Sequence, residues 1–542
     1  MFLVYHQSVT GSGALLWDRT AMGQLGKLIN KAIVLLTSVF LAAQLFARDR
    51  KELNNGVVIA ANWQEYSGEY AAYLYQSFNG ASDQLAGQIA TVPPDKKPAI
   101  ITDIDDTLIP ATHYFASLVD TDGTKSIEPD RYRPARALPG AVAFLQQANA
   151  LGVEIFYVSR RPDKTKAITI KALQQLGYPV LSEHHVLLQA PGLPPGKRDK
   201  RQSIIDKGYH PVMLLGDQLE DLHDVNDDKQ RWLDHHQNRF GHQWFILPNS
   251  VYGLWTEDVA EDEPGTQATT YPVAPAQQYR QHIATAELWM SQSADFAATA
   301  LQAYNLASRA LAAPENSQAE NRAVVVDIDG TLVNYPPIHI DPPFCRTLPN
   351  PEEKMRSYER QLSVSAIPGA KAFLDQAVAL GYKIFYLTAR DQSSGRPGFH
   401  GDVEELTLKQ LNSYGFPNVT RGNLLNCAKF CPPRRKKCGK EYQRHAITSG
   451  KVDGKRYDVR LYVGDLLDDF DLKERGLSPF DRSSVEATRD DYGRKYFVIP
   501  NPLNKTWMWH HYSKFARQDI CQMSDRERSE IRKRLVKEAA SN

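Results

Sequence analysis

The feature that most constrains the fold is an internal duplication, because long stretches of the 542-residue chain occur twice in the same order. The segment "ALPGAVAFLQQANALGVEIFYVS" at 137–159 matches "AIPGAKAFLDQAVALGYKIFYLT" at 366–388, and "FILPN" at 245–249 matches "FVIPN" at 497–501. Chance similarity does not keep such segments in order, and the chain is too long for one ordinary hydrophobic core. We therefore expect two homologous units, each with its own core.

Short apolar runs alternate with amphipathic helical stretches in both units. In the first unit the runs lie at 98–103, 153–158, 185–189, 211–216 and 244–248. This alternation indicates a parallel sheet whose two faces are covered by helices. The sequence therefore predicts an α/β fold with two tandem Rossmann-like domains. Each domain would have a mainly parallel sheet, helices on both faces and a small helical cap or N-terminal helix.

The repeats and the composition between them also predict domain boundaries. The stretch 257–280 is polar and rich in Pro and Thr, which is typical of a linker. The predicted order is a signal region, a first domain, the linker, a second domain and a helical tail, at 1–47, 52–256, 257–280, 281–515 and 516–542.

The N-terminal region resembles an export signal. Lys27 and Lys31 precede the uncharged, mostly apolar run 32–47, and Met22 is the expected start. This layout is typical of a secretory signal peptide and is short for a membrane span. We expect a periplasmic or secreted protein without stable membrane insertion after cleavage; the alternative is an uncleaved signal that anchors the chain in the inner membrane. The net charge of +1 gives no reason to expect a nucleic acid polymer as partner.

All cysteines lie in the second half of the chain: Cys345, Cys427, Cys431, Cys438 and Cys521. In an oxidising compartment they would form disulfides with one cysteine left over. The alternative is a zinc site built from the three cysteines between 427 and 438.

Carboxylates gather where the apolar runs end. "AIITDIDDTLIP" at 99–110 and "AVVVDIDGTLVN" at 323–334 each place two aspartates one residue apart after a buried strand. Ligands of open α/β sheets bind beyond the carboxyl ends of the strands, so the polar residues at these ends would form one site in each unit. The first set is Asp103, Asp105, Ser159, Lys197, Asp217 and Asp221. The second set is Asp327, Asp329, Thr388, Lys440, Asp465 and Asp469.

Clustered carboxylates in a cleft cannot all remain ionised without a compensating charge. A hard divalent cation with oxygen ligands resolves this repulsion, and Mg²⁺ typically combines a few carboxylates with substrate phosphate oxygens. A hydroxyl group and a lysine suit the other phosphate oxygens. One carboxylate then remains to attack phosphorus, and a second can transfer a proton. These residue types therefore predict phosphoryl transfer with Mg²⁺.

The four motifs together resemble the signatures of the haloacid dehalogenase (HAD) superfamily. The stretches "LPGAVAFL", "KRDKRQSIIDKGY", "LLGDQLEDL" and "LPNSVYGLW" narrow the resemblance to subfamily IIIB, the class C acid phosphatases, which include lipoprotein 5'-nucleotidases. Plant vegetative storage proteins are relatives of this group. The resemblance covers 57–255 well and 283–515 less tightly, and it implies that both domains are HAD-like.

The resemblance also implies residue roles. Asp103 and Asp327 would be nucleophiles, and Asp105 and Asp329 would be acid/base groups. Ser159 and Lys197, like Thr388 and Lys440, would hold the phosphoryl group. Mg²⁺ would bind Asp103, the carbonyl of Asp105, Asp217 and Asp221, and in the second unit Asp327, Asp329, Asp465 and Asp469. Thr107, Arg201, Thr331 and Arg444 are predicted to bind substrate.

The predicted function is that of an exported, Mg²⁺-dependent acid phosphatase that hydrolyses small-molecule phosphomonoesters, with nucleotides as one candidate class. The alternatives are a non-catalytic binding or storage protein on the same fold, or a protein in which only one domain is active. Gln44 stands where lipoprotein relatives carry a lipidated cysteine, so lipid anchoring is not expected. Asp106, which is Gly330 in the second unit, receives no role.

Overall fold

The computed structural model describes most of both units. The described residues are 57–117, 136–192, 196–224, 228–255, 285–317, 320–334, 364–390, 403–430, 439–504, 506–508, 510–511, 527, 530 and 533–534. The predicted signal region, the linker and the cysteine-rich segment 431–438 lie outside them, as do Cys345, Cys521 and most of the C-terminal tail. No helix of the described part is both long and apolar enough to cross a membrane.

Each unit contains a five-stranded parallel sheet. The first has the order β3-β2-β1-β4-β5. Its strands are β1 (Lys97–Thr102), β2 (Glu154–Pro162), β3 (Val186–Gln189), β4 (Tyr209–Gly216) and β5 (Trp244–Ile246). The second has the order β10-β9-β6-β7-β8. Its strands are β6 (Arg322–Asp327), β7 (Lys383–Thr388), β8 (Leu424–Asn426), β9 (Asp458–Gly464) and β10 (Tyr496–Val498). The predicted parallel sheets and tandem α/β fold are confirmed.

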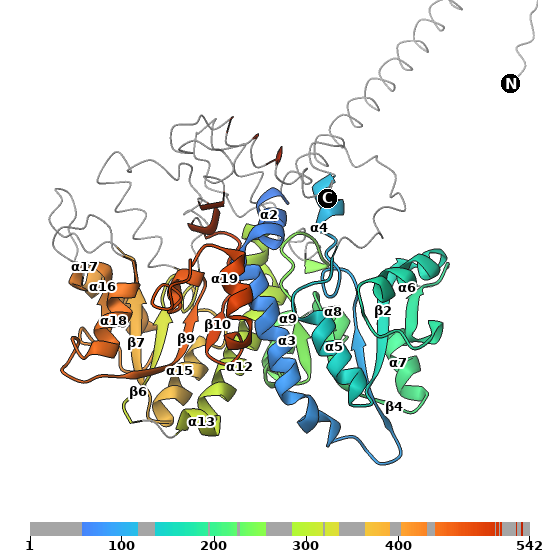
Figure 1. Cartoon of the computed structure of the whole chain (residues 1–542), viewed down its shortest axis with the longest axis horizontal. Coiled ribbons are helices and arrows are strands. Elements are labelled where there is room, and N and C mark those ends of the chain that lie inside the picture. Colours follow the sequence, from blue (N-terminus) through green and yellow to red (C-terminus); the bar gives the residue numbers. More distant parts are fainter. Residues whose placement is uncertain are drawn as a thin grey trace, which may run out of the picture.

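Helices flank both sheets (Figure 1). In the first unit they are α2 (Val58–Tyr66), α3 (Gly68–Ile89), α4 (Thr112–Ser117), α5 (Ala141–Ala150), α6 (Lys166–Gln175), α7 (Arg198–Asp206), α8 (Leu219–Leu222) and α9 (Lys229–His236). In the second unit they are α12 (Ala294–Ala312), α13 (Pro314–Ser317), α15 (Ala370–Ala379), α16 (Val403–Ser413), α17 (Cys427–Phe430), α18 (Glu441–Ser449) and α19 (Arg482–Ala487). The central strands are buried and rich in Ile and Val, which suits a sheet covered on both faces.

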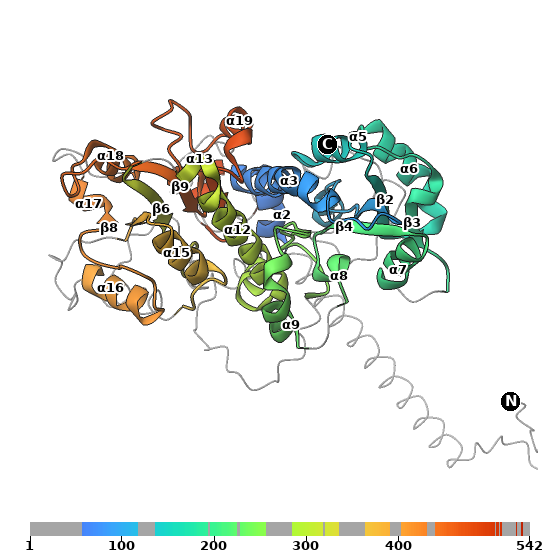
Figure 2. The ribbon, with the colours of Figure 1, turned by 90° about the horizontal axis from the view of Figure 1, so that it is seen from below.

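The two long helices α3 and α12 run between the sheets in both views (Figures 1 and 2). Ser67 starts α3 by accepting a hydrogen bond from the Tyr70 N–H, and Ser293 starts α12 by accepting from the Asp295 N–H. The helices contact each other through the Tyr73 hydroxyl, which donates to the Thr299 carbonyl oxygen at 2.8 Å. They form the centre of the contact between the units.

Each long helix also binds the edge strand of the opposite sheet. The side-chain amide of Gln76 in α3 accepts from the Val498 N–H at 2.6 Å and donates to the Val498 carbonyl at 3.3 Å. Gln302 in α12 does the same with Ile246, at 2.7 and 3.0 Å. Ile246 and Val498 lie on β5 and β10, which end their sheets, so each glutamine occupies the place of a further strand.

An asparagine in each long helix, about one helical turn after the glutamine, also contacts the opposite unit. The Asn79 amide donates to the carbonyls of Arg489 and Tyr492 at 2.8 and 2.9 Å. Asn305 donates to those of Gln237 and Phe240 at the same two distances. The same residue types thus make the same contacts in both directions. The two units are therefore related as the partners of a two-fold symmetric dimer, but within one chain.

Two glycines allow each long helix to pack closely against the opposite unit. Gly493 has a φ of 83°, and a Cβ atom there would lie 2.7 Å from the Gln76 carbonyl oxygen. Gly241 is equivalent, with a φ of 69° and the Gln302 carbonyl oxygen 3.0 Å from such an atom. A side chain at either position would have both an unfavourable backbone conformation and a clash with the helix.

We expect Gly493→Ala to destabilise the protein more than Gly454→Ala, which is a matched control because Gly454 has a φ of 85° and open space around it. The control measures only the left-handed backbone, at a cost of about 1–2 kcal/mol. Overpacking against α3 should add about 1–3 kcal/mol. The free energy of unfolding from urea titrations tests this, and equal losses in the two variants would contradict a close contact at Gly493.

Candidate active site

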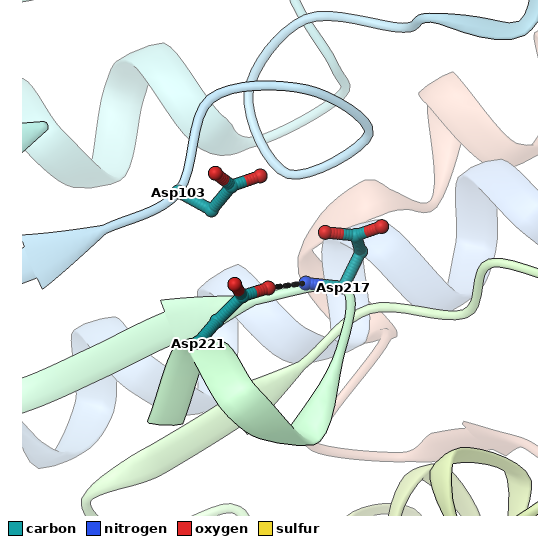
Figure 3. Close-up of side chains that lie close together, drawn as sticks. All are labelled: Asp103, Asp217 and Asp221. Atoms are coloured by element: carbon teal, nitrogen blue, oxygen red, sulfur yellow. Dashed lines mark hydrogen bonds between the residues drawn. The ribbon is translucent and has the colours of Figure 1, made fainter. Parts of the chain in front are cut away.

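The acids of each unit meet at the carboxyl ends of two neighbouring central strands. Asp103 follows β1, and Asp217 and Asp221 follow β4, which pairs with β1 where the strand order reverses. All three side chains are buried, with ligand oxygens within 4.8 Å of one another (Figure 3). Asp327, Asp465 and Asp469 form the equivalent group in the second unit, within the same limit. The folded chain therefore brings together two sets of acids that are distant in sequence.

A tight turn orients two of the acids. The Asp221 Oδ2 accepts from the N–H groups of Asp217 and Gln218, at 3.1 and 3.0 Å. In the second unit, the Asp469 Oδ2 accepts from the Leu466 N–H at 2.9 Å. Each turn thereby fixes one oxygen of its last acid and leaves the other oxygen to face the cluster.

A buried lysine lies against each cluster. The Lys197 ammonium contacts Asp103 and lies 2.5 Å from the Asp221 Oδ1. Lys440 contacts Asp327 and lies 2.5 Å from Asp469. Burial alone would lower the pKa of each lysine, but the neighbouring carboxylates outweigh burial and raise it, so both lysines stay charged.

One lysine cannot compensate for the acids of its cluster. Burial, opposed by Lys197 and reinforced by Asp221, raises the pKa of Asp103 to about 6. Burial likewise raises that of Asp327 to about 7, and those of Asp217 and Asp465 well above their usual range. Among the described residues, the buried Asp465 Oδ1 has no hydrogen-bond partner. Crowded buried carboxylates with an unused oxygen fit a small divalent cation such as Mg²⁺.

The second aspartate of each motif faces an arginine instead of the acid cluster. Arg161 donates from Nε and Nη2 to the two oxygens of Asp105, at 2.9 and 2.8 Å. Arg390 forms the same fork with Asp329, at 2.9 and 2.8 Å. The Asp105 and Asp329 side chains thus lie outside the carboxylate clusters, so their predicted metal role rests on the backbone carbonyls alone.

Sequence reasoning missed both arginines, although each lies two residues after a predicted hydroxyl. The Ser159 Oγ accepts from the Arg161 N–H at 3.1 Å, and the Thr388 Oγ1 accepts from the Arg390 N–H at 3.0 Å. The signal was available as "SRR" at 159–161 and "TAR" at 388–390, which repeat an arginine at the same position. These bonds fix the backbone near the end of β2 and directly after β7.

Asparagines that follow the last strands also contact the acids. Asn249 donates to the Asp217 Oδ2 at 2.7 Å, and Asn501 donates to the Asp465 Oδ2 at the same distance. Both belong to the repeated "PN" after the last strand, for which the sequence predicted no contact with the acids. In the second unit Asn504 adds a further donor to Asp465 at 2.7 Å, where the first unit has Tyr252, which is stacked on Phe115.

The two arginines predicted to bind substrate contact backbone carbonyls and acids near the sites. Arg201 donates to the Glu220 carbonyl at 2.5 Å and pairs with Asp224. Arg444 donates to the Asp468 carbonyl at 2.6 Å and pairs with Glu474. Both therefore support the acid-bearing turns, and their contact with substrate stays a prediction. Sequence spacing placed them near the site but gave no side-chain direction.

The predicted substrate threonines are completely buried. The Thr107 Oγ1 donates to the Asp217 Oδ1 at 3.5 Å, and the Thr331 Oγ1 donates to the Asp327 Oδ2 at 3.3 Å. Their hydroxyls thus contact acids of the clusters, and their binding of substrate stays a prediction.

The unassigned pair Asp106 and Gly330 has a structural explanation. Both have left-handed backbones, with φ of 53° and 82°, a conformation that glycine and aspartate tolerate better than most residues. The Asp106 Oδ1 accepts from the Ala111 N–H at 2.9 Å and so holds the loop that follows the motif. This acid therefore shapes the turn that follows Asp103 and Asp105.

The raised carboxyl pKa values predict a pH-dependent effect of metal on stability. At about pH 2 these acids are protonated in both states; as the pH rises through about 4 toward about 7 the unfolded chain releases protons that the folded, metal-free chain retains, so the unfolding free energy falls. Mg²⁺ binds the ionised acids, so its stabilisation should be larger at about pH 7.5 than at about pH 5. Melting temperatures with Mg²⁺ and with EDTA test this; an equal gain at both pH values would contradict metal binding at these carboxylates.

Comparison with known proteins gives a family for both units. The family model described as HAD superfamily, subfamily IIIB (Acid phosphatase), matches residues 42–255 and 263–507. Vegetative storage protein 2 of Arabidopsis thaliana is 25% identical over 261 residues, 45% of this chain and 92% of that protein. Vegetative storage protein 1 of the same plant is 29% identical over 163 residues, 28% of this chain and 54% of that protein, so the chain spans about half of its length.

Among solved structures, part of the chain is similar to the class C acid phosphatase from Bacillus anthracis. It is 27% identical, with a TM-score of 0.36, and the match covers 42% of this chain and 96% of that one. The family model matches nearly all of both units, once in each, as the duplication predicts. The chain therefore belongs to the acid phosphatase family of HAD subfamily IIIB, which it contains twice.

Proposed function

We propose that this protein is an exported, Mg²⁺-dependent phosphomonoesterase with a catalytic site in each unit. The observation that carries the proposal is the buried cluster of three aspartates with a charged lysine, found in both units at the strand ends. Family membership supports the same reaction. The motif signature and the N-terminal sequence support metal dependence and export, and the charged lysine beside each acid cluster suits the oxygens of a phosphorylated small molecule.

In the proposed reaction, an oxygen of Asp103 attacks phosphorus and the bond from phosphorus to the leaving oxygen breaks. For this step Asp105 must release the two-pronged contact with Arg161 and carry a proton, which it gives to that oxygen so that the group leaves as an alcohol. Asp105 then takes a proton from water, whose oxygen attacks the aspartyl-phosphate and releases phosphate and the Asp103 carboxylate. Asp327 and Asp329 have these roles in the second unit.

Other side chains hold the reacting groups. Lys197 and Ser159 would bind phosphoryl oxygens, as would Lys440 and Thr388. Asp103, Asp217 and Asp221 would hold the Mg²⁺ of the first unit, with their second-unit equivalents doing the same. When bound, the cation would neutralise the acids and stabilise charge that develops on the phosphoryl group.

The alternative of a storage or binding protein without catalysis has support in the names of the plant relatives. Against it stands the completeness of both sites. Each unit retains a nucleophile candidate, an acid/base candidate held by an arginine and a lysine on the cluster. A purely structural protein has no need to bury these like charges together.

We expect the protein to release phosphate from p-nitrophenyl phosphate with Mg²⁺ and to lose this activity in EDTA. Asp103→Asn and Asp327→Asn should each remove the contribution of one unit, because an amide oxygen is a much weaker nucleophile. The double variant should lose activity about 10³-fold or more. Asp375→Asn, at an exposed acid paired with Lys371, is the control and should retain full activity.

Absence of metal-dependent turnover in the natural chain would contradict the proposed function. Loss of all activity in Asp103→Asn alone would show that only the first unit is catalytic, and loss in Asp327→Asn alone would show the same of the second.

Arg161 gives a second prediction for the same reaction. Its guanidinium holds both oxygens of Asp105, so Arg161→Lys retains the charge but not the two-pronged contact. In the Asp327→Asn background we expect both Arg161→Lys and Arg161→Ala to lower kcat about 10–100-fold, with a smaller change in KM. Steady-state kinetics at several pH values tests this. Full activity of Arg161→Lys would show that the charge alone suffices.

A further inference from the structure

The turn between the metal-ligand aspartates is completed by the other unit. In the first unit, the N–H groups of Asp217 and Gln218 donate to Asp221, within the turn. The next N–H, that of Leu219, donates to the Asp295 Oδ1 at 2.8 Å. Asp295 belongs to α12 of the second unit, so one of three successive donors in the turn depends on the opposite half of the chain.

The second unit has the equivalent contact, with the roles of the two units exchanged. The Leu467 N–H, in the turn between Asp465 and Asp469, donates to the Glu69 Oε1 at 3.4 Å. Glu69 belongs to α3 of the first unit and lies in the first helical turn after Ser67, as Asp295 does after Ser293. The duplication therefore supplies two independent occurrences of the same arrangement.

Both contacts are buried and tightly packed. Glu69 and Asp295 are 4% and 5% exposed, so no solvent replaces them as acceptors for the turn. A Cβ on Gly68 would lie 2.6 Å from the Leu467 side chain, which shows how closely α3 approaches the turn. On the other side, Leu219 lies in an apolar cluster with Ala298 and Leu301 of α12. The long helices thus contact both the backbone N–H groups and the leucine side chains of the turns.

We propose that Asp295 and Glu69 are positioning residues that act across the interface, each setting the metal-ligand turn of the opposite unit. Asp295 serves the site of Asp103, and Glu69 serves the site of Asp327. Each half of the chain then has an incomplete site without the other. The activity readouts below depend on the proposed phosphatase function, whereas the metal-binding readout does not.

The test uses the full chain with one site disabled at a time. In the Asp327→Asn background, Asp295→Ala should lower the kcat of the first unit, or its affinity for Mg²⁺, roughly tenfold or more, which is typical for residues that orient metal ligands. Calorimetric titration with Mn²⁺ should show a matching loss of affinity. Asp295→Asn retains a side-chain oxygen that accepts from Leu219, so it should restore both values to within about twofold.

The reverse background separates positioning from general damage. In Asp103→Asn, where only the second unit turns over, Asp295→Ala should change activity and Mn²⁺ affinity less than about twofold. Glu69→Ala should instead lower those of the second unit, with a smaller effect because its contact is longer. Should Asp295→Ala melt too early to assay, Asp295→Ser replaces it, because its hydroxyl is too short to reach Leu219.

An equal loss in both units would overturn the proposal, and so would a loss confined to the unit that contains the substituted residue. If no form of the protein releases phosphate, the phosphatase proposal fails, and the Mn²⁺ affinities alone decide on the role of Asp295. Turnover that is intact in every Asp295 variant, with unchanged Mn²⁺ affinity, also overturns the inference.

Discussion

The reciprocal bonds between the glutamines and the edge strands are the interaction on which the rest of the structure depends. Gln76 and Gln302 each satisfy an outward-facing N–H and C=O of the opposite sheet. All these groups are buried, where an unpaired backbone group costs about 1–3 kcal/mol. Each sheet therefore has its edge completed by the other half of the chain.

This arrangement also determines where the sites lie. The edge strands β5 and β10 pair with β4 and β9, whose ends carry the acid-bearing turns. A helix that binds the edge strand along its length therefore reaches the turn with its first residues. The same contact that joins the units brings Asp295 and Glu69 against the turns.

Much of this could be predicted from the sequence, because strand pattern and strand-end position are local properties. The apolar runs before Asp103 and Asp217 gave the strands, and the rule for parallel sheets brought the acids together. Side-chain direction is not local: spacing placed Arg201 near the site, but its guanidinium binds the turn from behind. The packing of α3 and α12 against the opposite sheets could not be predicted either, since Gln76 pairs with a residue 422 positions away.

Comparison of the two units shows identical residues at their interface and a difference beside the acid clusters. Glutamine, asparagine and glycine are the same in both copies where the units meet, at Gln76 and Gln302, Asn79 and Asn305, and Gly241 and Gly493. Around the acids the copies differ, with Tyr252 in one and Asn504 in the other. Covalent linkage gives the second copy a high effective concentration. It also allows each site wall to change alone, which a symmetric dimer of identical chains cannot do.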